Sequence, residues 1–200
     1  MENIWISSWK HCDWVGKTDL ILLVLLSIYS WAIMIDKFIA FKKTKKANEK
    51  FLNNFYMGKI ISIPQSPWSR IFSRVSREKT KQDFTEEKLL TTLKRFGNEE
   101  VYSLGSGIDF LLSVSAVAPF MGLLGTVWGI LMAFHRIGLT GTSSISIIAS
   151  GVSEALIVTF VGLLVAIPAA LGYNYLDGQL RRIQTEGNAV LESIYNTLKQ

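Results

Sequence analysis

The 200-residue chain has few of the features that a soluble enzyme or a disulfide-stabilised protein needs. It has a single cysteine, Cys12, so no disulfide can form within the chain. It also lacks GxGxxG, Walker and HExxH motifs. His11, Cys12 and Asp13 are consecutive, so they cannot all point at one metal ion without an unusual backbone. We therefore identify no catalytic residue, no metal site and no cofactor, and we predict that the protein is not an enzyme.

Charge is missing from two long stretches of the chain. Residues 110–134 and 155–176 contain no Asp, Glu, His, Lys or Arg. As helices they would extend about 37 Å and about 33 Å, at about 1.5 Å per residue. A bilayer core is about 30 Å thick. The composition, with 49% hydrophobic and 18% charged residues, also favours a small polytopic membrane protein over a soluble domain.

A third apolar run, Leu20 to Ile35, is shorter and lies between Asp19 and Asp36. It can span a membrane only if flanking residues join it and nearby lysines reach toward the headgroups. A secretory signal peptide is the alternative, but the positive charges mostly follow this run and no small-x-small cleavage site comes after it. We predict a retained transmembrane helix.

Basic residues are concentrated in one loop, and this sets the predicted topology. Of the 21 lysines and arginines, 15 lie within residues 36–109, with a cluster directly after the first span. The positive-inside rule places that loop in the cytoplasm, which gives an N-out and C-in chain. The same cluster suits anionic lipid headgroups. We predict contact with membrane lipid and no nucleic-acid partner.

These features together predict an all-α membrane protein with three transmembrane helices and long helices that extend into the cytoplasm. The predicted segments are a periplasmic or interfacial N-terminal segment (1–18), transmembrane helix 1 (19–41), a largely helical cytoplasmic loop (42–108), transmembrane helix 2 (109–134), a short periplasmic hairpin (135–144), transmembrane helix 3 (145–176) and a cytoplasmic helical tail that continues it (177–200).

The cytoplasmic loop carries its own helix signals. Pro64 and Pro67 break the loop, and Asp83 with Glu86 resembles a capping box. Apolar residues at helical spacing follow over 89–108. This pattern predicts a helix that feeds directly into the second span.

Small residues form a stripe on each of the two longer spans. Gly122, Gly125 and Gly129 follow one another in the second span, and Gly162 and Ala166 lie in the third. Such stripes let membrane helices approach closely. We interpret them as helix-packing residues, since a stripe alone does not indicate a pore.

Polar residues accompany these stripes. Thr126 and Thr159 each lie about 25 Å from the cytoplasmic end of their span at helical rise, so the two hydroxyls could share one level. A membrane threonine usually bonds its own helix, and a shared pathway is the alternative. Glu154 stands at the outer edge of the third span, where a carboxylate either faces water or relays protons or ions.

Pro119 and Pro168 lie inside the cytoplasmic halves of the same two spans, where each removes a backbone hydrogen bond. A kink is the simpler interpretation and a gate is the alternative. Proton movement normally needs a titratable group near the barrier, and residues 110–134 and 155–176 have none. A partner would have to supply that group to these two spans.

The sequences VAPFMGLLGTVWGILMAF (117–134) and SEALIVTFVGLLVAIPAALGYN (153–174) resemble the TolQ, ExbB and MotA superfamily of ion-driven stators. SWAIMIDKFIAFKKTKKANEKF (30–51) is more similar to the TolQ branch than to the ExbB branch. The resemblance implies a multi-pass protein of the bacterial inner membrane, forming a homopentamer around the membrane helices of a TolR- or ExbD-like partner dimer whose aspartate cycles protons.

A TolQ-like member would drive a TolA-like periplasm-spanning protein for outer-membrane integrity and cell division. The alternatives are an ExbB-like member that energises TonB-dependent import, or a passive membrane scaffold.

Functional residues of the resembled family are assigned to positions of this chain only where the sequence motifs match. The threonine of GTVWG is Thr126, the threonine of ALxxT is Thr159, and the glutamate of EAL is Glu154. The resemblance implies that both threonines line the proton path beside the partner's aspartate. This chain departs from the family pattern at 148–151, where IASG stands in place of VAPG and Ser150 replaces a proline. The cytoplasmic loop is also shorter than in typical members. We expect a difference at the channel mouth.

Overall fold

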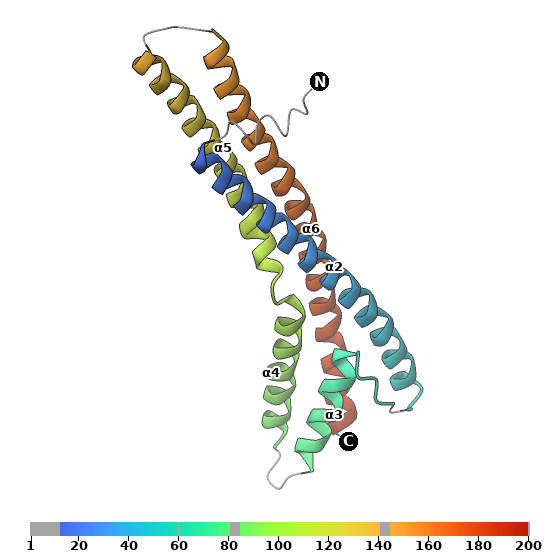
Figure 1. Cartoon of the computed structure of the whole chain (residues 1–200). Coiled ribbons are helices and arrows are strands. Elements are labelled where there is room, and N and C mark those ends of the chain that lie inside the picture. The colour runs from blue at the N-terminus through green and yellow to red at the C-terminus, as the bar shows by residue number, and fades with distance from the viewer. Residues whose placement is uncertain (1–12, 60, 81–84, 141–144, 200) are drawn as a thin grey trace. The chain divides into compact units, whose positions relative to one another are not determined.

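A computed structural model describes residues 13–59, 61–80, 85–140 and 145–199. Within these ranges it contains helices and no strand, which confirms the predicted all-α class. The helices are α2 (Trp14–Tyr56), α3 (Pro67–Lys79), α4 (Glu86–Gly105), α5 (Ile108–Thr140) and α6 (Ile145–Lys199) (Figure 1). Three of them, α2, α5 and α6, are long and apolar enough to cross a membrane. This confirms the three predicted spans, while the N-out and C-in orientation stays a prediction.

The helices run beyond the predicted span boundaries. α2 begins before residue 19 and continues past residue 41, and α5 continues past residue 134. α6 is unbroken into the tail that follows the third span. Residues 1–12 of the predicted N-terminal segment and residues 141–144 of the predicted hairpin lie outside the described residues.

The prediction that α4 feeds directly into the second span is wrong. α4 ends at Gly105, Ser106 leaves the helical conformation with a ψ of 127°, and Gly107 has a φ of +87°. That positive φ is a conformation that glycine adopts without steric cost. The helix is therefore interrupted, and α5 begins afresh at Ile108. At the other end of α4, Thr85 is the N-cap without a side-chain cap bond, and Asp83 lies outside the described residues.

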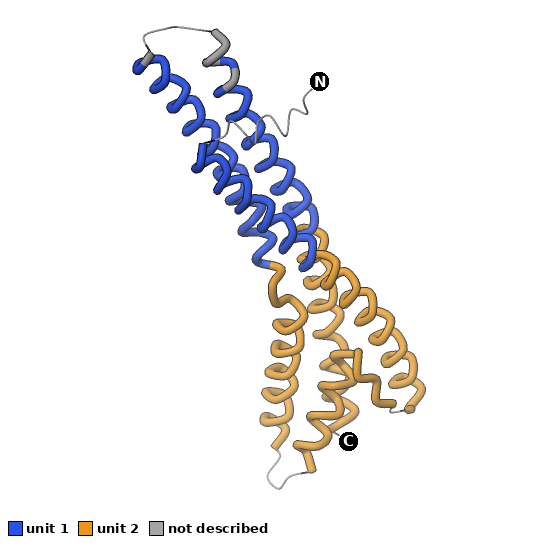
Figure 2. Tube along the Cα trace, in the orientation of Figure 1, with its two compact units in different colours: residues 1–33, 109–173 blue, residues 34–108, 174–200 orange. Residues whose placement is uncertain are grey.

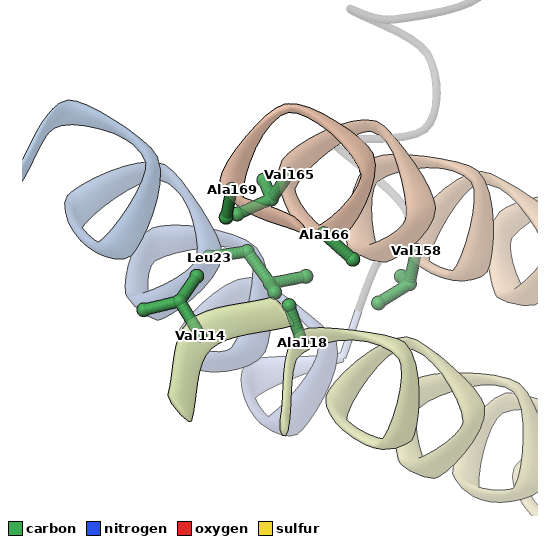
Figure 3. Packing of buried hydrophobic residues seen from close by; sticks show 7 residues of the cluster. All are labelled: Leu23, Val114, Ala118, Val158, Val165, Ala166 and Ala169. Atoms are coloured by element: carbon green, nitrogen blue, oxygen red, sulfur yellow. The ribbon is translucent and has the colours of Figure 1, made fainter. Parts of the chain in front are cut away.

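The chain divides into two compact units, residues 1–33 with 109–173 and residues 34–108 with 174–200 (Figure 2). The first, unit 1, has a core in which one leucine of α2 meets valines and alanines of α5 and α6 (Figure 3). Its short side chains keep the helices close, as is typical of membrane bundles. The core residues are Leu23, Val114, Ala118, Val158, Val165, Ala166 and Ala169.

In unit 2, the first turn of α3 is stabilised by the N-cap residue Ser66 and by the buried ring of Trp68. The Oγ of Ser66 accepts a hydrogen bond from the N–H of Ser69 (3.3 Å) and donates one to Asn48 (2.7 Å). Pro67, where the sequence predicted a break, is the first residue of α3, a position that needs no N–H donor. The Trp68 ring beside it is buried against Gly187 of α6, where an added Cβ would lie 2.1 Å from the ring.

Polar contacts join α3 to α4 within unit 2. Arg70 pairs with Glu100, and Arg74 lies 4.1 Å from the centre of the Phe96 ring. At the C-terminal end of α4, Lys37 donates from its Nζ to the carbonyl of Leu104 at 3.1 Å. A lysine there satisfies one of the carbonyls that every helix leaves open at its C-terminal end.

We expect Trp68→Ala to lower the stability of unit 2 by about 3–5 kcal/mol, because it removes a fully buried ring and leaves a cavity. Thermal unfolding in detergent, with amide hydrogen exchange to locate the change, measures this. Tyr102→Ala is the control, since Tyr102 is 81% exposed on α4. Equal losses in the two variants would contradict the role given to the Trp68 ring.

Candidate functional site

The α5–α6 contact in unit 1 is made by backbone on backbone. A Cβ added at Gly122 would lie 2.9 Å from the Cα of Thr159. A Cβ added at Gly162 would lie 2.7 Å from the carbonyl oxygen of Ala118. Real Cβ atoms do not approach backbone atoms this closely, so each position admits only glycine without a shift of the helices. The two predicted packing glycines therefore face each other's helix at one crossing.

Thr159 and Thr126 use their hydroxyls differently at this crossing. The Oγ1 of Thr159 donates across the contact to the carbonyl oxygen of Gly122, at 2.8 Å. The Oγ1 of Thr126 donates within its own helix to the carbonyl of Leu123, at 2.7 Å. Gly122 and Thr126 are about one helical turn apart, so the two hydroxyls lie at neighbouring levels rather than at one shared level. Thr126 is 9% exposed within a single chain, whereas Thr159 is half-buried.

The other small residues of the two stripes continue this contact. A Cβ added at Gly129 would lie 2.9 Å from the Cβ of Ala155. A Cβ added at Gly125 would meet the side chain of Val158. Ala166 is buried in the core of unit 1.

Both predicted kink residues lie within continuous helices. Pro119 is half-buried in α5 and Pro168 is half-buried in α6. Neither helix ends at its proline, so the kink and the gate stay predictions. Position 150 is helical in α6, but the Ser150 side chain lies outside the described part of the chain.

A small cavity lined by three charged residues and mostly apolar neighbours lies toward the end of unit 1 that contains Asp13 and Glu154. Its volume is about 20 Å³, which exceeds the roughly 10–15 Å³ that one water molecule requires. Asp13 and Arg136 form an ion pair at 2.8 Å beside it. Glu154 lines the cavity rather than pointing only to bulk solvent. The remaining lining residues are Gly16, Gly125, Trp128, Gly129, Met132, Ala133, Gly151, Ala155 and Val158.

One polar residue of unit 1 escaped the sequence analysis, which used Asp19 only to mark the edge of the first apolar run. Asp19 is 6% exposed, and its Oδ2 is buried without a hydrogen-bond partner among the described residues. The helical spacing of Gly16, Asp19, Leu23 and Ser30, all buried, would have placed it on the inward face of α2. Unit 1 thus contains a carboxyl group of its own beside the glycine stripe.

Helices that are long enough to cross a membrane and meet through glycine contacts define a polytopic membrane protein, and polar groups inside such a bundle are typical of channels and transporters. The MotA/TolQ/ExbB proton channel family matches residues 58–188, more than half of the chain. The chain belongs to this family, which confirms the resemblance seen in its motifs.

Individual relatives agree with the family assignment. The Tol-Pal system protein TolQ of Haemophilus influenzae is 31% identical over 199 residues, covering 89% of this chain and 86% of the relative. The biopolymer transport protein ExbB of Salmonella typhimurium is 28% identical, covering 89% and 79%. ExbB of Xanthomonas campestris pv. campestris is 32% identical, covering 82% and 73%. The relatives are thus transport and Tol-Pal proteins, similar to this chain over most of their length.

The family and the three spans together confirm the predicted multi-pass localisation in the bacterial inner membrane. They assign no role to single residues. The pathway role of Thr126, Thr159 and Glu154 therefore stays a prediction.

We expect Gly122→Ala to separate α5 from α6 and to lengthen or break the bond from Thr159 to the carbonyl of residue 122. The added Cβ meets backbone, which cannot rotate away. Thermal stability in detergent should fall clearly. Gly178→Ala is the matched control, because Gly178 is helical with nothing within 4 Å of an added Cβ. That variant should be neutral or up to about 1 kcal/mol more stable. Equal stability of the two variants would contradict the close contact.

Proposed function

We propose that this protein is a TolQ-like proton-channel subunit. With a TolR-like single-span partner dimer, it would couple the proton motive force to a TolA-like periplasm-spanning protein that maintains outer-membrane integrity and supports cell division. The chain would form a homopentamer around the partner's membrane helices. Family membership and the threonines at the α5–α6 crossing support this proposal.

The single observation that carries the proposal is the hydrogen bond from Thr159 to the Gly122 carbonyl. In this bond the hydroxyl of one motif helix contacts the backbone of the other, at a partly buried position in unit 1. A hydroxyl both donates and accepts, so it can pass a hydrogen bond along a path. The cavity beside Asp13, Arg136 and Glu154 lies on the same unit and provides polar groups for proton arrival or departure.

The exposed faces of the spans fit an assembly of several copies. Large apolar side chains of α5 and α6 are uncovered in a single chain, and such surfaces face either lipid or neighbouring helices. Packing against further copies would enclose the partially exposed side of Thr159. The most exposed residues of these faces are Phe120, Leu123, Leu124, Val127, Leu131, Phe134, Leu139, Leu156, Phe160, Leu164, Ile167 and Leu171.

An ExbB-like role in TonB-dependent import is the second candidate, because ExbB relatives match the chain about as well as TolQ relatives do. The two candidates differ in the partner that the subunit binds. Co-purification with a TolR-like and a TolA-like protein favours the first, and co-purification with an ExbD-like and a TonB-like protein favours the second.

We expect Thr159→Val to abolish most proton flux in liposomes that contain this protein with its co-expressed single-span partner. Valine keeps the shape of threonine but removes the donor and acceptor. Thr126→Val should lower proton flux as well. Thr159→Ser should keep proton flux, because serine keeps the hydroxyl. Changing the partner's membrane aspartate to Asn should stop flux, because that group is the expected proton carrier. A pH-sensitive dye inside the vesicles measures the rate.

The control for these variants is Thr185→Val. The Thr185 hydroxyl also donates within its own helix, to the Arg181 carbonyl at 3.0 Å, but it is exposed in unit 2. Thr185→Val should therefore leave proton flux unchanged. Wild-type flux in both Thr126→Val and Thr159→Val, with the complex still assembled, would reduce both residues to packing roles and favour the passive scaffold.

A further inference from the structure

Asp19 occupies a core position on α2. Gly16, Asp19, Leu23 and Ser30 are all buried and recur at steps of three, four and seven residues, which is the spacing of the inward face of a packed helix. Leu23, one turn after Asp19, is completely buried in the core of unit 1 (Figure 3). A carboxyl group therefore stands where the pattern otherwise places small or apolar residues.

The position is costly for a charged group. Asp19 is 6% exposed, and its Oδ2 accepts no hydrogen bond from any residue that the structure describes. An ionised carboxylate buried in a membrane span without partners is strongly unfavourable. Such a group needs a proton, a cation or water at its free oxygen, so this oxygen is suited to binding a proton.

The surroundings connect Asp19 with the proposed site. Its Oδ2 would lie 3.1 Å from a Cβ at Gly125, so the absence of a side chain at 125 makes room for the carboxyl. Gly125 precedes Thr126 in the chain and also lines the cavity. Trp128 lines that cavity too, and its Nε1 is a second buried polar atom without a partner among the described residues. The Oδ2 of Asp19 and the Nε1 of Trp128 are thus two buried polar atoms at residues that line this cavity or lie next to its lining.

Among the described residues, the other titratable groups near this end of unit 1 are few. They include Lys17 of α2 and Asp13 just before that helix, and Asp13 is paired with Arg136 of α5. α6 contributes Glu154, which lines the cavity. His135 on α5 is exposed. Among these, Asp19 is the group most deeply buried in the bundle.

We propose that Asp19 is a proton-binding site of this chain, which exchanges protons between the cavity lined by Glu154 and the level of Thr126 and Thr159. A hydronium ion in the cavity gives up a proton, an O–H bond forms at Oδ2, and the carboxylate becomes a neutral acid. On release that bond breaks, its electron pair stays on Oδ2, and the proton passes to water at the threonine level. This inference deepens the proposed channel function and rests on it for the direction of flow.

Infrared difference spectroscopy on the full chain in lipid nanodiscs tests proton binding without any flux. We expect a pH-dependent carbonyl band of a protonated carboxylic acid that shifts in D₂O and is absent from Asp19→Asn. Asp109→Asn is the matched control, because Asp109 is exposed in the first turn of α5. Identical spectra of wild type and Asp19→Asn at every pH would overturn the proposal.

Proton flux through the assembled complex tests the path. Asp19→Asn should lose most of the flux, Asp19→Glu should recover part of it, and Asp109→Asn should keep it, with co-purification of the partner unchanged in all three. Wild-type flux in Asp19→Asn beside lost flux in Thr159→Val would overturn this inference and leave the proposed function standing. Wild-type flux in both variants would overturn the two together.

Discussion

The close approach of α5 and α6 is the constraint on which unit 1 depends. Inside a bilayer, lipid is as apolar as leucine, so helices associate through packing and hydrogen bonds rather than through exclusion of water. Gly122 and Gly162 allow this packing, since a Cβ at either position would meet backbone atoms of the opposite helix. The bond from Thr159 to the Gly122 carbonyl exists only because the helices are that close. The glycine packing of α5 on α6 and the hydrogen bond from Thr159 therefore depend on each other.

Unit 2 is held together by different forces. Trp68 buries a large apolar ring, and Arg70 and Arg74 bind the carboxylates and the aromatic face of α4. Such contacts are typical of bundles in water, where burying apolar surface drives association. The basic residues that set the predicted topology belong to the same unit. The chain thus joins membrane-type packing in one unit to soluble-type packing in the other.

The spans and the glycine contacts could be predicted from the sequence because both rest on local patterns: charge-free length and small residues at helical spacing. The break at Gly107 was missed because apolar residues keep helical spacing on both sides of it, and only backbone geometry reveals the positive φ. The partner of Thr159 lies in another helix, so no local rule could have found it. Asp19 was missed because it was treated as the end of an apolar run, although its spacing from Leu23 already indicated the core.

A carboxyl group in unit 1 would allow proton transfer across the span to occur in several short steps instead of one long step. One elementary charge that crosses 100 mV releases about 2.3 kcal/mol, so a single proton performs little work and many must pass. Fast passage is hindered if a proton must cross the whole apolar span to one partner group. An acid at the level of Gly125 would split that distance into shorter transfers, each between groups that can hold a proton. The buried Oδ2 of Asp19, which has no hydrogen-bond partner among the described residues, is suited to the proposed step.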